Sequence, residues 1–201
     1  MPFIEDSLIS AGLSPIAGVD EAGRGACAGP LVIASVILRN IYSPRLSKLR
    51  DSKQLSEKQR DELFPVIKEE ALAISVVRIE PAEIDERGVH VANLEGMRRA
   101  VQTLSTPPNY VLTDGYQIDG MAAPSLAIWK GDQVALTISA ASIIAKVTRD
   151  KIMVELDKEY PGYGLAKHKG YITASHTAAL KSLGVLDIHR KSYSNIAALI
   201  N

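Results

Sequence analysis

The sequence predicts an α/β protein in which helices pack on a mixed β-sheet. Two short β-branched apolar runs come first, further apolar runs then alternate with segments of helical periodicity, and glycine or proline separates the segments. The chain of 201 residues is 46% hydrophobic and 23% charged, which is typical of an ordinary globular protein. We therefore expect one domain, residues 1–201, built around one core.

The first two predicted strands are neighbours. Residues 16–20 and 31–38 are apolar runs rich in β-branched residues, and several glycines and a proline lie between them. A short glycine-rich connection favours antiparallel pairing, because parallel strands need a long crossover.

Helical segments follow and alternate with strands. A capping-box pattern at Ser56 predicts a helix to about residue 70, and residues 72–79 again have the composition of a strand. Apolar residues recur at intervals of three and four over 91–104, which predicts an amphipathic helix that ends before a Pro-Pro pair.

The second half of the chain continues this alternation. Strands are predicted over 110–113 and 126–129, and a long helix over about 139–160. A last helix is expected over 173–183, with Gly184 at its C-terminal cap.

Charge is balanced in total but unevenly distributed. Lysine plus arginine equals aspartate plus glutamate at 23 each, yet residues 1–145 hold 14 basic and 18 acidic residues, and residues 146–201 hold 9 and 5. A basic segment on an acidic body is a weak indication of nucleic-acid binding. Residues 161–194 also contain three histidines and three tyrosines, so this surface could neutralise phosphates and place rings against sugars.

Cysteine content and hydropathy restrict the cellular compartment in which we expect this protein. A single cysteine, Cys27, excludes an intramolecular disulfide and a cysteine-rich zinc site, and favours the reducing cytoplasm. The uncharged run of residues 133–145, like every other uncharged run in the chain, is shorter than the roughly 20 apolar residues that cross a bilayer. We expect neither a signal peptide nor a membrane anchor.

Four carboxylates follow the ends of predicted strands. They are Asp20, Glu21, Asp114 and Asp132. Side chains at strand ends converge in sheets of this kind, and carboxylates brought together repel one another unless they are protonated or share a cation. Hard oxygen ligands suit Mg²⁺ or Mn²⁺, and a pair of such ions commonly serves in-line displacement at phosphorus. The simpler interpretation is that each acid only caps a turn.

A glycine-rich dinucleotide-binding pattern also occurs here. Gly23, Gly25 and Ala28 match it after a strand. That pattern must open a helix, however, whereas residues 31–38 predict a strand. Asp20 and Glu21 would also place negative charge beside the pyrophosphate, so we do not favour this interpretation.

Seven short motifs occur in a fixed order between Ile16 and Tyr193. They are GVDEAGRG at 18–25, DSK at 51–53, TDG at 113–115, KGD at 130–132, AASIIAKVTRD at 140–150, YGLAKHKGY at 163–171 and HRKS at 189–192. In this order the set closely resembles the ribonuclease HII family of bacteria.

The resemblance implies an RNase H-like fold with a short, helical, basic C-terminal region, residues 161–201, that binds substrate. It implies a metal-dependent endonuclease, using Mn²⁺ or Mg²⁺, that hydrolyses the RNA strand of RNA/DNA hybrids. Duplex DNA would be nicked 5′ of an embedded ribonucleotide, leaving 5′-phosphate and 3′-hydroxyl ends. Asp20, Glu21, Asp114 and Asp132 would be the catalytic and metal-binding acids. The expected protein is a cytoplasmic monomer that serves ribonucleotide excision during DNA replication and repair.

Substrate-binding residues are also implied by the resemblance. Gly23, Arg24 and Gly25 would approach the sugar and phosphates closely, and Tyr163 would hydrogen-bond the ribose 2′-hydroxyl. Lys53 would contact a phosphate near the cut.

The long helix has a polar face that could grip a DNA backbone. Ser142 and Lys146 lie on it at helical spacing with Ser139, Arg149 and Asp150. For Asp150, a salt bridge with a neighbour is the simpler expectation.

Two other functions remain open at this stage. A module that binds RNA/DNA hybrids without cleaving them would keep the substrate-binding surface, although the presence of all four acids argues against it. A DNA nuclease or recombinase of the same fold would cut an all-DNA duplex as well as one that contains a ribonucleotide.

Overall fold

A computed structural model describes residues 3–200, apart from the side chains of residues 50–54. It contains one five-stranded sheet with the strand order β3-β2-β1-β4-β5. The strands are β1 (Ile16–Ala22), β2 (Leu31–Leu38), β3 (Ala71–Ile79), β4 (Tyr110–Asp114) and β5 (Ser125–Ile128). The predicted strands are all present, and the predicted α/β class with a mixed sheet is confirmed.

The pairing pattern fixes where the strands end. Strands β1, β2 and β3 pair antiparallel, whereas β4 pairs parallel to both β1 and β5. The carboxyl ends of β1, β4 and β5 therefore lie at the same edge of the sheet.

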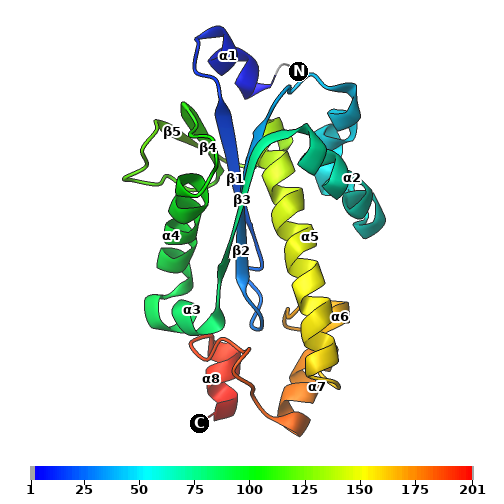
Figure 1. The fold of residues 1–201 in the computed structure, drawn as a ribbon. Coiled ribbons are helices and arrows are strands. Elements are labelled where there is room, and N and C mark those ends of the chain that lie inside the picture. Colours follow the sequence, from blue (N-terminus) through cyan, green and yellow to red (C-terminus); the bar gives the residue numbers. More distant parts are fainter. Residues whose placement is uncertain (1–2, 201) are drawn as a thin grey trace.

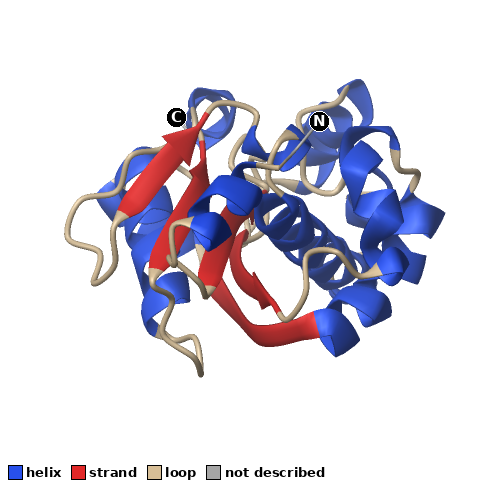
Figure 2. Ribbon diagram, turned by 90° about the horizontal axis from the view of Figure 1, so that it is seen from above, coloured by secondary structure: helices blue, strands red, loops and turns tan. Residues whose placement is uncertain are grey.

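Helices cover both faces of this sheet (Figures 1 and 2). The helices are α1 (Ile4–Ser10), α2 (Glu57–Glu70), α3 (Pro81–Arg87), α4 (Val89–Gln102), α5 (Leu136–Glu159), α6 (Leu165–His168), α7 (Ala174–Leu183) and α8 (Ser194–Ile200). Two 3₁₀ helices, η1 (Pro44–Gln54) and η2 (Gly131–Gln133), complete the set. Helices α2 and α5 lie on one side of the strands and α3 and α4 on the other. In Figure 1, α6 lies beside the lower part of α5, and α7 and α8 lie below the lower end of the sheet.

Strand β2 shows why the sequence predicts a buried sheet. All eight of its residues are buried. Val32 and Val36 pack in the cluster that contains α5, whereas Ile33 and Ile37 pack in the cluster that contains α4. Because both faces are covered, the strand is a continuous apolar run rather than an alternating one.

Close packing of α5 against β1 depends on Gly18. A Cβ atom at this position would lie 2.0 Å from the carbonyl carbon of Thr137 and 2.2 Å from the amide nitrogen of Ile138. Only glycine allows the helix to approach the strand this closely. The approach brings the first turns of α5 to the level of Asp20, two residues further along β1.

Most predicted helices agree with the structure, and the short ones do not appear in the prediction. The Ser56 side chain accepts a hydrogen bond from the Gln59 amide and closes the expected capping box at α2. The long helix begins at Leu136, slightly earlier than predicted, and α7 ends at the expected Gly184 cap. Within residues 3–200, no helix combines the length and apolarity needed to cross a membrane.

Candidate active site

The four strand-end acids come from three neighbouring parts of the sheet edge. Asp20 and Glu21 lie in β1, and Asp114 is the last residue of β4. The parallel register pairs Val19 with Thr113, so Asp20 and Asp114 each follow the same rung of the sheet. Asp132 lies in η2, just after β5, and is buried with 8% of its surface exposed.

Backbone and hydroxyl groups orient these carboxylates. The Gly131 amide donates to Asp114 Oδ1 at 2.8 Å, and the Glu21 amide donates to Asp20 Oδ1 at 2.7 Å. Ser142, on the first part of α5, also hydrogen-bonds Asp20. The bond to Gly131 places η2, and with it Asp132, next to Asp114.

Burial and like charge raise the pKa values of the β1 acids. Desolvation is the main reason that the pKa of Asp20 lies well above its usual range, and the charges of Glu21 and Asp114 add to the shift. Desolvation likewise raises the pKa of Glu21 to about 7, against the opposing charge of Arg24 and together with that of Asp114. The structure thus brings Asp20, Glu21 and Asp114 into one electrostatic group.

Asp132 is placed at this edge of the sheet by the hydrogen bond between the neighbouring Gly131 amide and Asp114. In the described part of the chain, no group of three or more histidine, cysteine, aspartate and glutamate side chains is already arranged as a set of metal ligands. The four acids share one edge of the sheet, where Asp20 and Asp132 are buried and Glu21 and Asp114 are half-buried.

Two buried arginines hold the glycine-rich loop that follows β1. Arg149 donates to the carbonyls of Pro30, Ala28 and Lys169 at 2.9, 3.0 and 2.8 Å. Arg190 donates to the Arg24 carbonyl at 3.0 Å.

The loop conformation fits glycine at position 23. Gly23 has φ +90°, and a Cβ atom there would lie 1.8 Å from Arg149 Nε. Within the Gly-Arg-Gly segment, the Arg24 carbonyl accepts hydrogen bonds from the Arg190 guanidinium and the Tyr193 hydroxyl, which hold the segment in place.

Comparison with known proteins identifies the family. The family model described as Ribonuclease HII matches residues 17–196. The chain belongs to the ribonuclease HII family. Proteins named Ribonuclease HII from Rhodococcus opacus and Mycobacterium avium are each 56% identical to it over 198 residues, which is 98% of this chain and 88% or 86% of theirs. The crystal structure of ribonuclease H2 from Pyrococcus horikoshii superimposes with a TM-score of 0.80 at 31% identity, covering 92% of this chain and 96% of that one.

Tyr163 of this ribonuclease HII, the residue expected to read a ribose, is buried. Its side chain is 5% exposed, and its hydroxyl donates to the Gly184 carbonyl at 2.8 Å. A contact with the substrate would require the ring to leave this packed site.

Tyr171 lies instead beside the glycine-rich loop. It is 40% exposed, and its ring is the nearest group to a Cβ atom built on Gly25, at 3.9 Å. The Arg149 guanidinium lies 5.6 Å from the centre of the same ring. Sequence reasoning did not single out Tyr171 although it ends the motif that begins at Tyr163, and the polar residues Lys169 and Thr173, two positions away on either side, were the available signal of exposure.

Two residues of the polar face of α5 are turned inward, contrary to the sequence expectation. Arg149 is fully buried against the glycine-rich loop. Ser139 is buried as well, and its hydroxyl donates to the Leu49 carbonyl at 2.8 Å. Neither residue can grip a DNA backbone, because each side chain is occupied by protein carbonyls.

Lys146 and Asp150 form the expected salt bridge, with Nζ and Oδ1 2.8 Å apart. Ser142 and Lys146 are half-buried. The side chain of Lys53, which the sequence analysis assigns to phosphate binding, lies outside the described residues.

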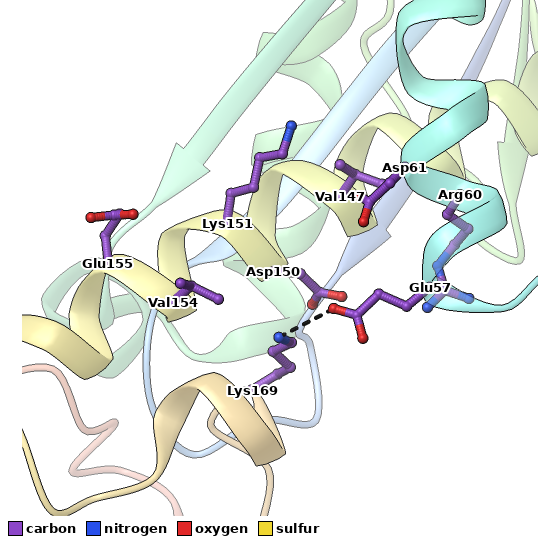
Figure 3. A pocket seen from close by; sticks show the side chains of 9 residues that line it. All are labelled: Glu57, Arg60, Asp61, Val147, Asp150, Lys151, Val154, Glu155 and Lys169. Carbon is purple, nitrogen blue, oxygen red and sulfur yellow. Dashed lines mark ion pairs between the residues drawn. The ribbon is translucent and has the colours of Figure 1, made fainter.

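A cavity of about 270 Å³ lies between α2 and α5 on this side of the molecule (Figure 3). It is lined by Glu57, Arg60, Asp61, Val147, Asp150, Lys151, Val154, Glu155 and Lys169. Its lysines and carboxylates are mixed, and Lys169 pairs with Glu57 at 3.4 Å. This mixed lining lacks the single sign of charge that a phosphate groove requires.

Proposed function

We propose that this chain hydrolyses the RNA strand of RNA/DNA hybrids and nicks duplex DNA 5′ of an embedded ribonucleotide. The products would carry 5′-phosphate and 3′-hydroxyl ends. The observation that carries the proposal is the group of buried and half-buried carboxylates at one edge of the sheet, next to a glycine-rich loop. Family membership supports the same activity, since members of this family are divalent-metal-dependent endonucleases that act on nucleic acid.

Asp20, Glu21, Asp114 and Asp132 would hold Mg²⁺ or Mn²⁺. All four offer oxygen donors, which hard divalent cations prefer. Among the described residues, Glu21 Oε2 is a buried atom without a hydrogen-bond partner, and the raised pKa of Glu21 shows that nearby positive charge does not fully compensate its ionised form. When bound, such ions would activate a water and stabilise the departing 3′-oxygen.

The chain's own groups would orient this donor set. Ser142 holds Asp20, and the Gly131 amide holds Asp114, so neither carboxylate rotates freely. Gly18 supports the same arrangement, because it allows α5 to bring Ser142 to the level of Asp20.

The loop of Gly23, Arg24 and Gly25 would read the ribose together with Tyr171. A backbone without Cβ atoms can approach a sugar closely, and the 2′-hydroxyl is the group that distinguishes RNA from DNA. Tyr171 is exposed next to Gly25, whereas the hydroxyl of Tyr163 is already bonded inside the protein. We therefore assign the hydroxyl contact to Tyr171 and a structural role to Tyr163.

The remaining expectations form part of the same proposal. The chain would act as one domain, residues 1–201, with residues 161–201 as the substrate-binding region. Lys53, Ser142 and Lys146 would contribute to the path of the substrate. The chain would be a cytoplasmic monomer that acts in ribonucleotide excision during replication and repair; the single, buried Cys27 agrees with the cytoplasmic location.

The test is cleavage of a labelled duplex that contains one ribonucleotide, with Mg²⁺ or Mn²⁺, by wild type and by Asp20→Asn. We expect loss of nicking in the variant and full activity in Asp119→Asn, a matched change at an exposed aspartate. Nicking that survives Asp20→Asn would refute the carboxylate mechanism. Equal cutting of an all-DNA duplex would favour a DNA nuclease, and binding of a hybrid without any cleavage would favour a silent binding module.

A further inference from the structure

A second cavity, of about 300 Å³, opens directly beside the candidate metal-binding acids. It is lined by Glu21, Asp114, Gly115, Tyr116, Trp129 and Lys130. Glu21 and Asp114 belong to the site described above. The rest of the lining carries two aromatic residues and a lysine that the proposed function does not use.

Trp129 is unusually exposed for a residue of its type. It is 81% exposed, the highest value among the large apolar side chains described, and it is the only tryptophan in the chain. An indole ring of this size favours a covered position, because it contributes a large apolar area. Exposed tryptophans at the edge of a cavity are characteristic of binding hot spots.

The backbone on both sides of Trp129 is fixed to the end of β4. On one side, the Gly115 amide donates to the Ile128 carbonyl at 2.9 Å; on the other, the Gly131 amide donates to Asp114 Oδ1 at 2.8 Å. Lys130, between them, has the left-handed φ of +57° that non-glycine residues rarely adopt. The turn that carries the indole is therefore already fixed next to Asp114 in the free protein. Binding of a ligand to this ring would cost little conformational entropy of the backbone.

We propose that Trp129, Tyr116 and Lys130 form a subsite for one deoxynucleotide of the cleaved strand. The indole ring packs against the deoxyribose, and the Lys130 ammonium group pairs with the adjoining phosphate. A ring flanked by a lysine and by cation-binding acids matches a sugar-phosphate chain better than it matches an apolar protein surface. This inference rests on the proposed function and adds a contact to it.

Topology indicates which nucleotide lies there. The ribose-reading loop connects β1 to β2, whereas the cavity lies at the ends of β4 and β5, on the other side of β1 in the strand order. The proposed cut is 5′ of the ribonucleotide, so the ribose lies 3′ of the cut. The cavity then receives the deoxynucleotide on the 5′ side, which keeps the new 3′-hydroxyl.

Tryptophan fluorescence tests the contact directly, since no other tryptophan contributes to the emission. Full-length Asp20→Asn is titrated with a labelled duplex that contains one ribonucleotide, and label anisotropy and tryptophan emission are recorded together. We expect emission to change saturably with the midpoint of the anisotropy curve. Saturated anisotropy with unchanged emission would overturn the subsite alone, and a duplex that does not bind at all would also overturn the proposed function.

Substitutions measure what the ring contributes. Trp129→Ala should weaken duplex binding about fivefold to tenfold, the lower end of the range for ring–nucleotide contacts, and Trp129→Phe should restore most of the affinity. Tyr42→Ala is the control, because Tyr42 is also an exposed aromatic but lies beside α1, where its hydroxyl bonds Asp6. Wild-type affinity in Trp129→Ala would refute the subsite.

An altered substrate tests which nucleotide is bound. An acyclic three-carbon spacer in place of the deoxynucleotide 5′ of the cut removes the sugar ring. The spacer should weaken binding by wild type and cause no further loss in Trp129→Ala, since the two changes remove the same contact. Equal losses in both proteins would overturn the assignment of the ring to this sugar.

Discussion

The Nε2 atoms of His176 and His189 lie 3.3 Å apart in the interior of the C-terminal region. His176 Nδ1 lies 3.0 Å from the Tyr171 carbonyl, to which it must donate, so its Nε2 accepts the proton of His189 Nε2. His189 Nδ1 in turn accepts from the Leu186 amide at 3.0 Å. Every ring nitrogen is therefore used, and both imidazoles are neutral.

Acid should destabilise the protein through this pair. Burial, together with the neighbouring His176, lowers the pKa of His189 to about 4, whereas a histidine in the unfolded chain titrates near 6.5. The folded state binds fewer protons between these values, so the free energy of unfolding is unaffected above about pH 6.5 and falls as the pH drops towards 4. For His189 the loss between pH 7.5 and pH 5 is about 2 kcal/mol.

Urea unfolding at the two pH values measures this loss. His189→Asn should lose less stability on acidification than wild type, whereas His90→Asn, at an exposed position, should behave as wild type does. An identical pH dependence in wild type and His189→Asn would contradict the assignment.

Glu21→Gln should stabilise the metal-free protein while it abolishes cleavage. Burial raises the pKa of Glu21 to about 7, so the ionised carboxylate opposes folding above that pH, and the penalty disappears as the pH falls towards 4.5. We expect the variant to gain about 1 to 2 kcal/mol at pH 8 in EDTA, after discounting for partial exposure, and to lose the advantage near pH 5.

Denaturant unfolding with and without Mg²⁺ checks this prediction. The ion should stabilise wild type more than the variant, because a ligand that binds only the folded state shifts the equilibrium towards it. A variant that is less stable than wild type at pH 8 would show that the Glu21 charge is already compensated.

Two glycines should respond differently to alanine. Gly18→Ala forces a methyl group into the backbone of Thr137, so we expect a loss of at least about 3 kcal/mol in the free energy of unfolding. At Gly25 the nearest group to an added Cβ is the Tyr171 ring at 3.9 Å, so Gly25→Ala should keep its stability within about 0.5 kcal/mol.

Thermal unfolding and nicking assays separate the two effects. Gly25→Ala should fold normally but cut a single ribonucleotide more slowly, because its methyl group narrows the gap next to Tyr171. A stable Gly18→Ala protein would mean that α5 can move away from β1 without cost.

The sequence predicts those parts of the molecule whose structure depends mainly on residues that are close together in the chain. Strand β2 is recognisable because both of its faces are buried, and α2 because Ser56 caps it. The four-residue helix α6 is too short to show any periodicity. The four acids could be predicted from the sequence because each lies at the end of a predicted strand or shortly after it.

Tertiary packing decides which residues of a predicted helix face are buried, and the sequence pattern does not show this. Helical spacing correctly places Ser139 and Arg149 on one face of α5, but it does not show that η1 and the glycine-rich loop cover parts of that face. The same limitation affects Tyr163, whose burial depends on α7 and the segment after it. The motif therefore contains both Tyr163 and Tyr171 but does not show that Tyr163 is buried and Tyr171 exposed.

Tyr171→Phe should lower activity on a ribonucleotide, whereas Tyr163→Phe should lower stability. If Tyr171 bonds the 2′-hydroxyl, loss of its own hydroxyl should lower kcat/KM at a single ribonucleotide about threefold to tenfold, the value of one hydrogen bond, and leave stability unchanged. Tyr163→Phe leaves the Gly184 carbonyl without its donor, so it should cost about 1 kcal/mol of stability while the preference for ribonucleotide over all-DNA duplex stays the same. Measuring both variants by thermal unfolding and by cleavage of the two duplexes separates the roles, since each change moves only one readout. A selective loss of ribonucleotide cleavage in Tyr163→Phe, with Tyr171→Phe fully active, would return the reading role to the buried residue.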